Sequence, residues 1–278
     1  MTGIALVTGS EGFIGRSLVA LLQQHGIPVR TLDLEAPKAP AGGRAHWQGS
    51  ITDWAMLQAA MEGVSTVYHL ASGAQLWAFD AQAMIQGNEE GTRLVLEAAQ
   101  KAGVRRVVHT STEAILQSRK GSADRKLLDE TIQPPEAAMC GAYCVAKLRA
   151  ERVAVEGARQ GIPVVIVNPS APIGPGDPHL TPPTRMLLGY LNGDFPGYLE
   201  TVLNLVDVRD VALGHLRAAE RGQTGERYLL GHTNIAMEEL LNLLAQLTGL
   251  SMPRFRVPYW LAYFVSGVEE LRARAGIA

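Results

Sequence analysis

Thr8-Gly9-Ser10-Glu11-Gly12-Phe13-Ile14-Gly15 is a glycine-rich segment with the spacing G-x-x-G-x-x-G. It follows an apolar run that begins at Ile4 and precedes leucines with helical spacing. Glycines let such a loop turn tightly and approach a pyrophosphate, and the N-terminus of the next helix favours negative charge. An ordinary glycine-rich turn has the same composition. The position between a predicted strand and a predicted helix favours a phosphate-binding loop.

Short β-branched runs alternate with longer helical segments over the first 168 residues. The runs predicted to be strands buried on both faces are Ile4–Thr8, Val29–Asp33, Thr66–Leu70, Val107–Ser111 and Val164–Asn168. Between them, apolar residues three and four apart predict helices. Gly26, Gly103 and Gly161 stand where these helices should end. The alternation predicts an α/β protein whose parallel sheet carries helices on both faces.

The rhythm loosens after Asn168. We expect residues 1–168 to form the dinucleotide-binding domain and residues 169–278 mostly a small substrate-binding lobe, with some elements returning to the first domain. The elements expected after residue 168 are helices near 186–191, over 210–221 and over 237–248, and strands near 202–206 and 226–230.

Composition excludes several classes of protein. The net charge is −2, with 47% hydrophobic and 19% charged residues, so no basic field is present to attract nucleic acid. Two cysteines are too few for a disulfide scaffold or a four-thiolate zinc site, and we expect no metal. The first basic residue is Arg16, and no apolar run reaches the roughly 18 residues of a membrane span. These features predict a soluble, cytoplasmic protein.

Asp33 ends the second predicted strand, and it bears on the choice of cofactor. A carboxylate there can accept hydrogen bonds from both ribose hydroxyls of an adenosine, and it repels a 2′-phosphate. NAD is therefore favoured over NADP. The alternative is that Asp33 only caps a loop.

Tyr143 and Lys147 are four residues apart at the start of a predicted helix, so they share one face. A phenol is a poor base at neutral pH, and a nearby ammonium lowers its pKa. With a hydroxyl from Thr112 to hold a substrate oxygen, the set can move a proton while a nicotinamide moves a hydride. Chance pairs with this spacing are common on protein surfaces. The position between strands 107–111 and 164–168 favours the functional interpretation.

Together these features resemble the extended short-chain dehydrogenases/reductases of the NAD-dependent epimerase/dehydratase kind. The resemblance runs from residue 1 to about 235. It is carried by Thr8–Gly15, Asp33, His69-Leu70-Ala71, Asn88–Thr92, Thr110-Ser111-Thr112, Tyr143–Lys147 and Asn168–Asp177. The stretches 168–177 and 204–211 are similar to the branch of dihydroflavonol reductases and 3β-hydroxysteroid dehydrogenases, whose members act mostly on alcohols and ketones.

The resemblance implies a Rossmann-type, doubly wound fold and roles for individual residues. Tyr143 would be the general acid/base, Lys147 its partner and ribose clamp, and Thr112 the ligand of the substrate oxygen, with Ser111 as second choice. A homodimer formed through two helices of the first domain is also implied. The implied cofactor contacts are Gly9, Glu11, Gly12, Phe13, Ile14, Gly15, Asp33, Ser50, Ile51, Leu70, Ala71, Ser72, Asn88, Thr110, Tyr143, Lys147, Pro169 and Ile173.

Departures from the family narrow the chemistry. Sugar-nucleotide 4,6-dehydratases carry Thr-Asp-Glu where this chain has Thr112-Glu113-Ala114, so one carboxylate is missing and dehydration is disfavoured. Ser50 stands where many members have an acid that touches the adenine, and Asp207 stands where many have His. The adenine contact and the substrate side are therefore expected to differ.

The sequence thus predicts an NAD-dependent oxidoreductase that interconverts a secondary alcohol and a carbonyl. An NAD-dependent sugar-nucleotide epimerase is the main alternative, and a non-catalytic dinucleotide-binding protein is a third. The identity of the small-molecule substrate stays open, because residues on loops cannot be oriented from sequence.

Several residues have a structural and a functional interpretation. Cys140 and Cys144 are expected to be small helix residues facing protein, rather than a redox pair. His69 is expected to be an interior histidine with hydrogen-bond partners. The basic run 119–126 is expected to be a solvated loop. The aromatic segment 255–264 is expected to pack on protein rather than lie at a membrane.

Overall fold

A computed structural model describes residues 3–37, 45–73, 80–117 and 127–261. Internal contacts divide the chain into two compact units. The first unit comprises residues 1–179 and 206–231, and the second comprises residues 180–205 and 232–278. The chain therefore leaves the first unit, returns to it, and leaves it again.

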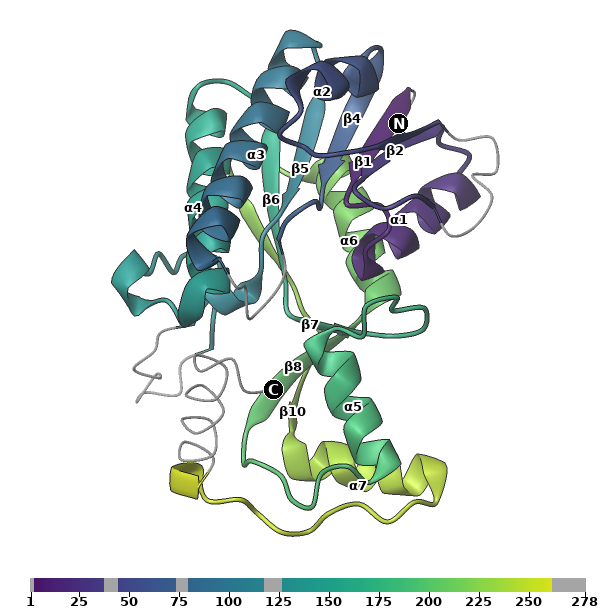
Figure 1. Cartoon of the computed structure of the whole chain (residues 1–278), viewed down its shortest axis with the longest axis vertical. Helices are drawn as coiled ribbons and strands as arrows, with labels where there is room; N and C mark the ends of the chain where they lie inside the picture. The colour runs from purple at the N-terminus through teal and green to yellow at the C-terminus, as the bar shows by residue number, and fades with distance from the viewer. Residues whose placement is uncertain (1–2, 38–44, 74–79, 118–126, 262–278) are drawn as a thin grey trace. The chain divides into compact units, whose positions relative to one another are not determined.

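A seven-stranded parallel sheet forms the centre of the first unit (Figure 1). Its strand order is β3-β2-β1-β4-β5-β6-β9. From β1 the chain adds strands first toward one edge (β2, β3) and then, from β4 on, toward the other edge, while all strands stay parallel. The predicted Rossmann-type, doubly wound fold is thereby confirmed. The strands are β1 (Ile4–Thr8), β2 (Val29–Asp33), β3 (His46–Gln48), β4 (Val64–His69), β5 (Arg106–Thr110), β6 (Val164–Pro169) and β9 (Arg227–Leu230).

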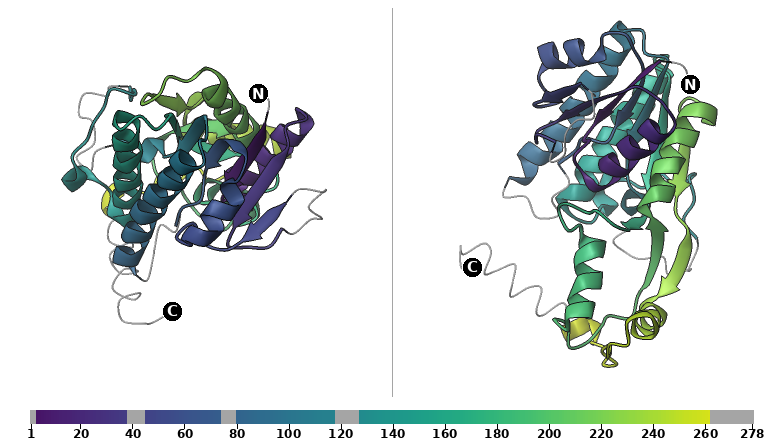
Figure 2. Two further views of the ribbon diagram at one scale, coloured as in Figure 1. Left: turned by 90° about the horizontal axis from the view of Figure 1, so that it is seen from above. Right: turned by 90° about the vertical axis from the view of Figure 1, so that its right-hand side faces the viewer.

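Helices cover both faces of this sheet (Figures 1 and 2). One face packs against α2 (Trp54–Met61), α3 (Ala81–Lys101) and α4 (Gly141–Arg159) around residues such as Leu57 and Val95. The other face packs against α1 (Phe13–Gln24) and α6 (Val208–Arg221) around Leu18 and Leu216. Because strands alternate their side chains, consecutive residues Val107 and Val108 of β5 enter opposite cores. Two 3-10 turns, η1 (Glu113–Leu116) and η2 (Glu136–Ala138), precede α4.

Glycine ends three helices of this unit, as predicted. Gly26, Gly103 and Gly161 have φ of +69°, +68° and +91°, which a glycine adopts without the steric strain of a Cβ. After each glycine, an apolar residue donates its N–H back to the last helical turn, as Ile27 does to the Leu22 carbonyl at 3.0 Å. This pattern satisfies the free carbonyls of the helix end. Local sequence alone therefore fixes where these helices stop.

The structure adds elements to the first unit that the sequence pattern did not show. The short strand β3 extends the sheet beyond β2, and α2 follows it. The strand predicted near 226–230 is β9, which pairs with β6 in the main sheet, from Ile166 opposite Arg227 to Pro169 opposite Leu230. Strand β7 (Ala171–Ile173) follows β6 directly.

The second unit contains α5 (Pro182–Asn192), most of β8 (Val202–Asp207), β10 (Thr233–Ala236) and α7 (Met237–Thr248). Strand β10 pairs antiparallel with β8, and the Asn204 amide donates to the Asn234 side-chain oxygen at 2.8 Å. Helix α5 is longer than the predicted 186–191, because Pro182 and Pro183 occupy its first positions, where the missing N–H has no cost. Buried Tyr190, Tyr198 and Leu241 form part of its core.

Within the described ranges, every helix is too short or too polar to cross a bilayer. Phe255, Tyr259 and Trp260 of the aromatic segment are exposed by 56–70%. These three side chains are therefore not covered within the described part of one chain, and the expectation that the segment packs on the substrate lobe or on a partner subunit stays a prediction. Residues 262–264 of that segment and the basic run 119–126 lie outside the described residues.

Candidate functional site

The glycine-rich segment forms a tight turn between β1 and α1. A Cβ on Gly9, which has φ of +72°, would lie 2.6 Å from the Ala71 backbone nitrogen. A Cβ on Gly15 would lie 2.1 Å from the Gly9 carbonyl oxygen. Even a single Cβ does not fit at either position, so the close packing of the backbone requires glycine at positions 9 and 15.

The start of α1 has free hydrogen-bond donors. Its N-cap is Gly12, which offers no side chain to cap the first turn. The Ser10 hydroxyl is buried in the same turn and has no hydrogen-bond partner in the described part of the chain. Buried polar groups are rarely left unpaired, and helix N-termini attract anions. The turn therefore fits a diphosphate.

Asp33 lies beside this turn at the end of β2. One carboxylate oxygen accepts the Glu11 N–H at 2.8 Å, and the other accepts the Glu35 N–H at 3.1 Å. Each oxygen keeps a further lone pair, so the ribose hydroxyls predicted to bind here still have acceptors. Asp33 therefore ties the glycine turn to the end of β2 as well as accepting the local Glu35 N–H. The buried Glu11 carboxylate pairs with Arg16 at 3.0 Å.

Other predicted cofactor residues lie around the same edge of the sheet. The Ala71 N–H donates to the Thr8 hydroxyl at 3.2 Å, which joins the end of β4 to the turn. Asn88 on α3 accepts the Gly73 N–H at 2.9 Å and donates to the Met84 carbonyl, so it fixes the segment after β4. The Ile51 side chain packs where a Cβ on Gly91 would stand, and the Ser50 hydroxyl bonds to Thr52.

His69 is the interior histidine that the sequence predicted. It is 1% exposed, and its ring nitrogens lie 2.9 Å and 3.1 Å from the hydroxyls of Thr8 and Thr92. Burial, with a smaller effect of Lys147, lowers the pKa of His69 to about 3. The ring is therefore neutral at physiological pH and joins β4 to α3.

Tyr143 lies in the first turn of α4, facing Thr112 at the carboxyl end of β5. The Thr112 oxygen accepts the Ala114 N–H at 3.3 Å. Burial raises the pKa of Tyr143, while the interaction with the Thr112 side chain opposes that rise. The neighbouring Ser111 hydroxyl is buried and has no partner in the described residues. Thr112, the first choice of the sequence, therefore lies within interaction distance of Tyr143.

Lys147 follows one turn later on α4 and is 5% exposed. Its ammonium donates to the Thr110 carbonyl at 3.1 Å. Burial lowers the pKa of Lys147 to about 8, and attraction to Glu151 opposes that change. The Thr110 hydroxyl is bonded to His215 on α6 at 2.9 Å, so this side chain is directed away from Lys147. A contact of Thr110 with the cofactor, as predicted, would therefore have to use its backbone atoms.

The two cysteines differ in their surroundings. Cys144 is buried in a small cluster with Ile115 and Leu148, as expected. Cys140 is the N-cap of α4 and is exposed, so the expectation that it faces protein is wrong. A helix N-cap lies at the end of the helix, where no preceding turn covers it, and is readily left at the surface.

Sequence analysis missed a buried polar group behind Tyr143 and Lys147. Glu151 is 1% exposed and pairs with Arg227 of β9 at 2.7 Å. It also accepts a hydrogen bond from Asn168 of β6 at 2.8 Å. The spacing of Tyr143, Lys147 and Glu151 by four residues places them on one helix face and was a visible signal.

A sequence model of the NAD dependent epimerase/dehydratase family matches residues 5–231. The chain belongs to this family. It is an NAD(P)-dependent enzyme of the extended short-chain dehydrogenase/reductase type, in agreement with the glycine turn, the unpartnered Ser10 hydroxyl and Asp33.

Relatives of this epimerase/dehydratase family member include reductases. It is 41% identical to a Synechocystis protein named "Putative dihydroflavonol 4-reductase", over 97% of this chain and 80% of the relative. It is 32% identical to cinnamoyl-CoA reductase 1 of Oryza sativa, over 88% of this chain and 75% of that protein.

Solved structures show the same fold. The crystal structure of gox2253 is 35% identical, has a TM-score of 0.86, and is covered to 84% by the whole of this chain. The 4,6-dehydratase DesIV of Streptomyces venezuelae, solved with NAD, is 25% identical, with a TM-score of 0.75 over 89% of this chain and 81% of that one.

Proposed function

We propose that this protein is an NAD-dependent oxidoreductase that interconverts a secondary alcohol and a carbonyl at Thr112, Tyr143 and Lys147. The observation that carries the proposal is the interaction of the Thr112 side chain with the Tyr143 phenol, with the buried Lys147 one helical turn away. Two neighbouring hydroxyls at the carboxyl end of a parallel strand are well placed to bind a substrate oxygen, because ligands of this fold bind at that edge.

The residues at the glycine turn would hold the cofactor. Backbone N–H groups after Gly9 and Gly12, with the Ser10 hydroxyl, would bind the diphosphate. Asp33 would accept hydrogen bonds from the adenosine ribose. The charge of Asp33 disfavours a 2′-phosphate, so NAD is preferred over NADP.

The chemistry divides between cofactor and protein. When bound, the nicotinamide ring accepts a hydride from the alcohol carbon or donates one to the carbonyl carbon. During oxidation, the Tyr143 oxygen takes the proton of the substrate hydroxyl, so that the C–H and O–H bonds break as the C=O bond forms. Thr112 holds the substrate oxygen, and the Lys147 charge favours the phenolate. Reduction runs through the same groups in reverse.

Alcohols and ketones are the proposed substrate class, as the name of the dihydroflavonol 4-reductase relative suggests. Both carboxylate oxygens of Glu113 accept hydrogen bonds from the Gln117 amide nitrogen, at 3.0 and 2.9 Å, and the neighbouring Ala114 carries no acid. Dehydration needs both an acid and a base, and this stretch supplies only one carboxylate, so dehydration is disfavoured.

A screen tests the proposal. Aryl alcohols such as 1-phenylethanol, 3β-hydroxysteroids and UDP-glucose are offered with NAD or NADP, and NADH absorbance is followed. We expect steady NADH formation with an alcohol, and its loss in Tyr143→Phe with NAD binding retained. Protein that is purified with NAD, forms no net NADH and isomerises UDP-glucose would instead be a sugar-nucleotide epimerase. Full turnover by Tyr143→Phe would contradict the site.

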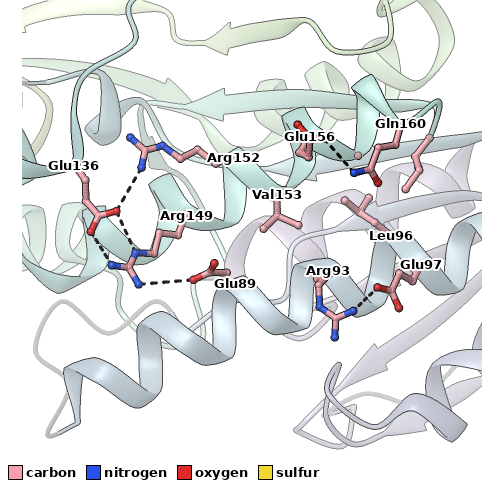
Figure 3. A pocket seen from close by; sticks show the side chains of 12 residues that line it. Glu89, Arg93, Leu96, Glu97, Glu136, Arg149, Arg152, Val153, Glu156 and Gln160 are labelled. Carbon is pink, nitrogen blue, oxygen red and sulfur yellow. Dashed lines mark hydrogen bonds and ion pairs between the residues drawn. The ribbon is translucent and has the colours of Figure 1, made fainter.

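We also propose a homodimer formed through α3 and α4. Between these helices lies a hollow of about 610 Å³ whose rim carries both signs of charge (Figure 3). Arg149 pairs with Glu136 at 2.7 Å and with Glu89 at 3.8 Å. A face of mixed charge can match itself across a two-fold axis. Light scattering should give twice the chain mass, and Arg152→Glu should shift the population toward monomer.

A further inference from the structure

Glu151, Asn168 and Arg227 come from α4, β6 and β9 and form a buried polar bridge behind the proposed site. Glu151 and Asn168 are at most 1% exposed. One Glu151 oxygen is 2.7 Å from Arg227 Nε, and the other accepts Asn168 Nδ2 at 2.8 Å. A charge buried this deeply is costly unless it is paired, so the arrangement is built around the Glu151 carboxylate.

The bridge continues from Asn168 to Thr112. Asn168 Nδ2 also donates to the Thr112 carbonyl at 3.1 Å. One amide nitrogen therefore connects Glu151 to the residue whose side chain interacts with Tyr143. Both acceptors are oxygens, which fixes the orientation of the Asn168 amide.

Arg227 anchors the other end of the bridge. Its guanidinium donates to the carbonyls of Glu130 and Ile132 at 3.1 and 2.8 Å, in the segment before α4. The Glu130 carboxylate in turn accepts the Leu229 N–H of β9 at 3.0 Å. Arg227, which pairs with the Glu151 carboxylate, therefore joins strand β9 to the segment before α4.

We propose that Glu151 and Asn168 are positioning residues, which hold the Thr112 backbone so that its hydroxyl meets Tyr143. This role rests on the proposed function of Thr112 and Tyr143. Neither residue contacts the substrate, and each acts through Thr112. A displacement of about 1 Å in a reacting group can lower the rate on the order of 100-fold.

An exchange of the two side-chain types separates positioning from simple structural support. Asn168→Asp removes the donor to Thr112 and places two carboxylates together. The double variant Glu151→Gln/Asn168→Asp restores one amide, one carboxylate and a hydrogen bond between them, but the Thr112 carbonyl still faces a carboxylate. Glu156→Gln, an exposed change on the same helix, is the control.

Each variant is measured by melting temperature, by NAD affinity, and by ¹⁹F NMR of 3-fluorotyrosine placed at position 143. We expect Asn168→Asp to melt lower and its resonance to move or broaden. The double variant should regain melting temperature while the resonance stays displaced. With the alcohol from the screen, kcat should fall on the order of 100-fold in both, with KM nearly unchanged.

Recovery of the resonance and of kcat together with stability in the double variant would overturn the proposal, since Glu151 and Asn168 would then only support the fold. If Asn168→Asp does not fold, Glu151→Gln is judged by the same two readouts. The ¹⁹F NMR measurement needs no substrate, so it decides whether the bridge positions Tyr143 even if no alcohol is turned over. Absence of alcohol turnover would contradict only the proposed function.

Discussion

The backbone N–H of Glu11 donates to the carboxylate of Asp33 at 2.8 Å, across 22 residues of sequence. This bond joins the glycine turn to the end of β2, so the groups proposed to bind the diphosphate and the ribose form one rigid corner. A residue that both shapes the corner and receives the ribose should affect cofactor choice more than stability.

Asp33→Asn should therefore change the cofactor preference. The amide keeps an oxygen for the Glu11 N–H but loses the charge that accepts ribose hydroxyls and repels a 2′-phosphate. Hydrogen bonds to a charged group contribute about 1.5–3 kcal/mol, so NAD should bind roughly 10- to 100-fold more weakly. Titration calorimetry with NAD and NADP measures the ratio of the two affinities. Asp53→Asn, which changes a helix cap elsewhere in the chain, is the control. An unchanged ratio would remove Asp33 from the cofactor site.

Gly15→Ala should abolish NAD binding, because the new Cβ would stand 2.1 Å from the Gly9 carbonyl oxygen. The turn would have to open. Gly87→Ala is the matched control, since its Cβ would meet nothing within 4 Å at an exposed position of helix α3. That change should stabilise the protein by about 0.5–1 kcal/mol. Equal melting temperatures and NAD affinities for the two variants would show that the turn is not tightly packed.

Lys147→Met should raise stability at neutral pH while it removes activity. Burial lowers the pKa of Lys147 from 10.5 to about 8. The unfolded chain then holds the proton more tightly between these values, so the wild type gains stability as pH rises from 8 to 10.5. The full penalty below pH 8 is up to about 3 kcal/mol. Thermal melting of both proteins at pH 7 and pH 10 measures this penalty. If the stability difference between Lys147→Met and the wild type does not narrow as pH rises, Lys147 does not have a lowered pKa.

His109→Leu should stabilise the protein, more at pH 5 than at pH 7. His109 is buried beside His69, and neither ring nitrogen has a hydrogen-bond partner in the described residues. Burial, with the nearby His69 and Lys147, holds the pKa of His109 well below 6.5. The unfolded ring takes up a proton as pH falls through 6.5, which favours unfolding by about 2 kcal/mol at pH 5. Urea unfolding at both pH values tests this, and a loss of stability at both would show that the ring is satisfied.

The main sheet and its helix ends could be predicted because their signals are local. Continuous β-branched runs identify strands buried on both faces, and glycines identify helix ends that need a positive φ. The short strand β3, with only His46–Gln48, carries too few residues for a periodic signal. The exposed Cys140 was misjudged because spacing on a helix does not show which positions face solvent.

The sequence by itself determined the alternation of strands and helices, the glycine turn, Asp33 and the shared face of Tyr143 and Lys147, because each depends on residues within a few positions of one another. Only the tertiary structure decided that β9 enters the main sheet, that Asn168 joins Glu151 to the Thr112 carbonyl, and that Glu151 pairs with Arg227. The physical reason is that such contacts join segments far apart in the chain, whose pairing is set by how strands and helices dock rather than by local conformational preference.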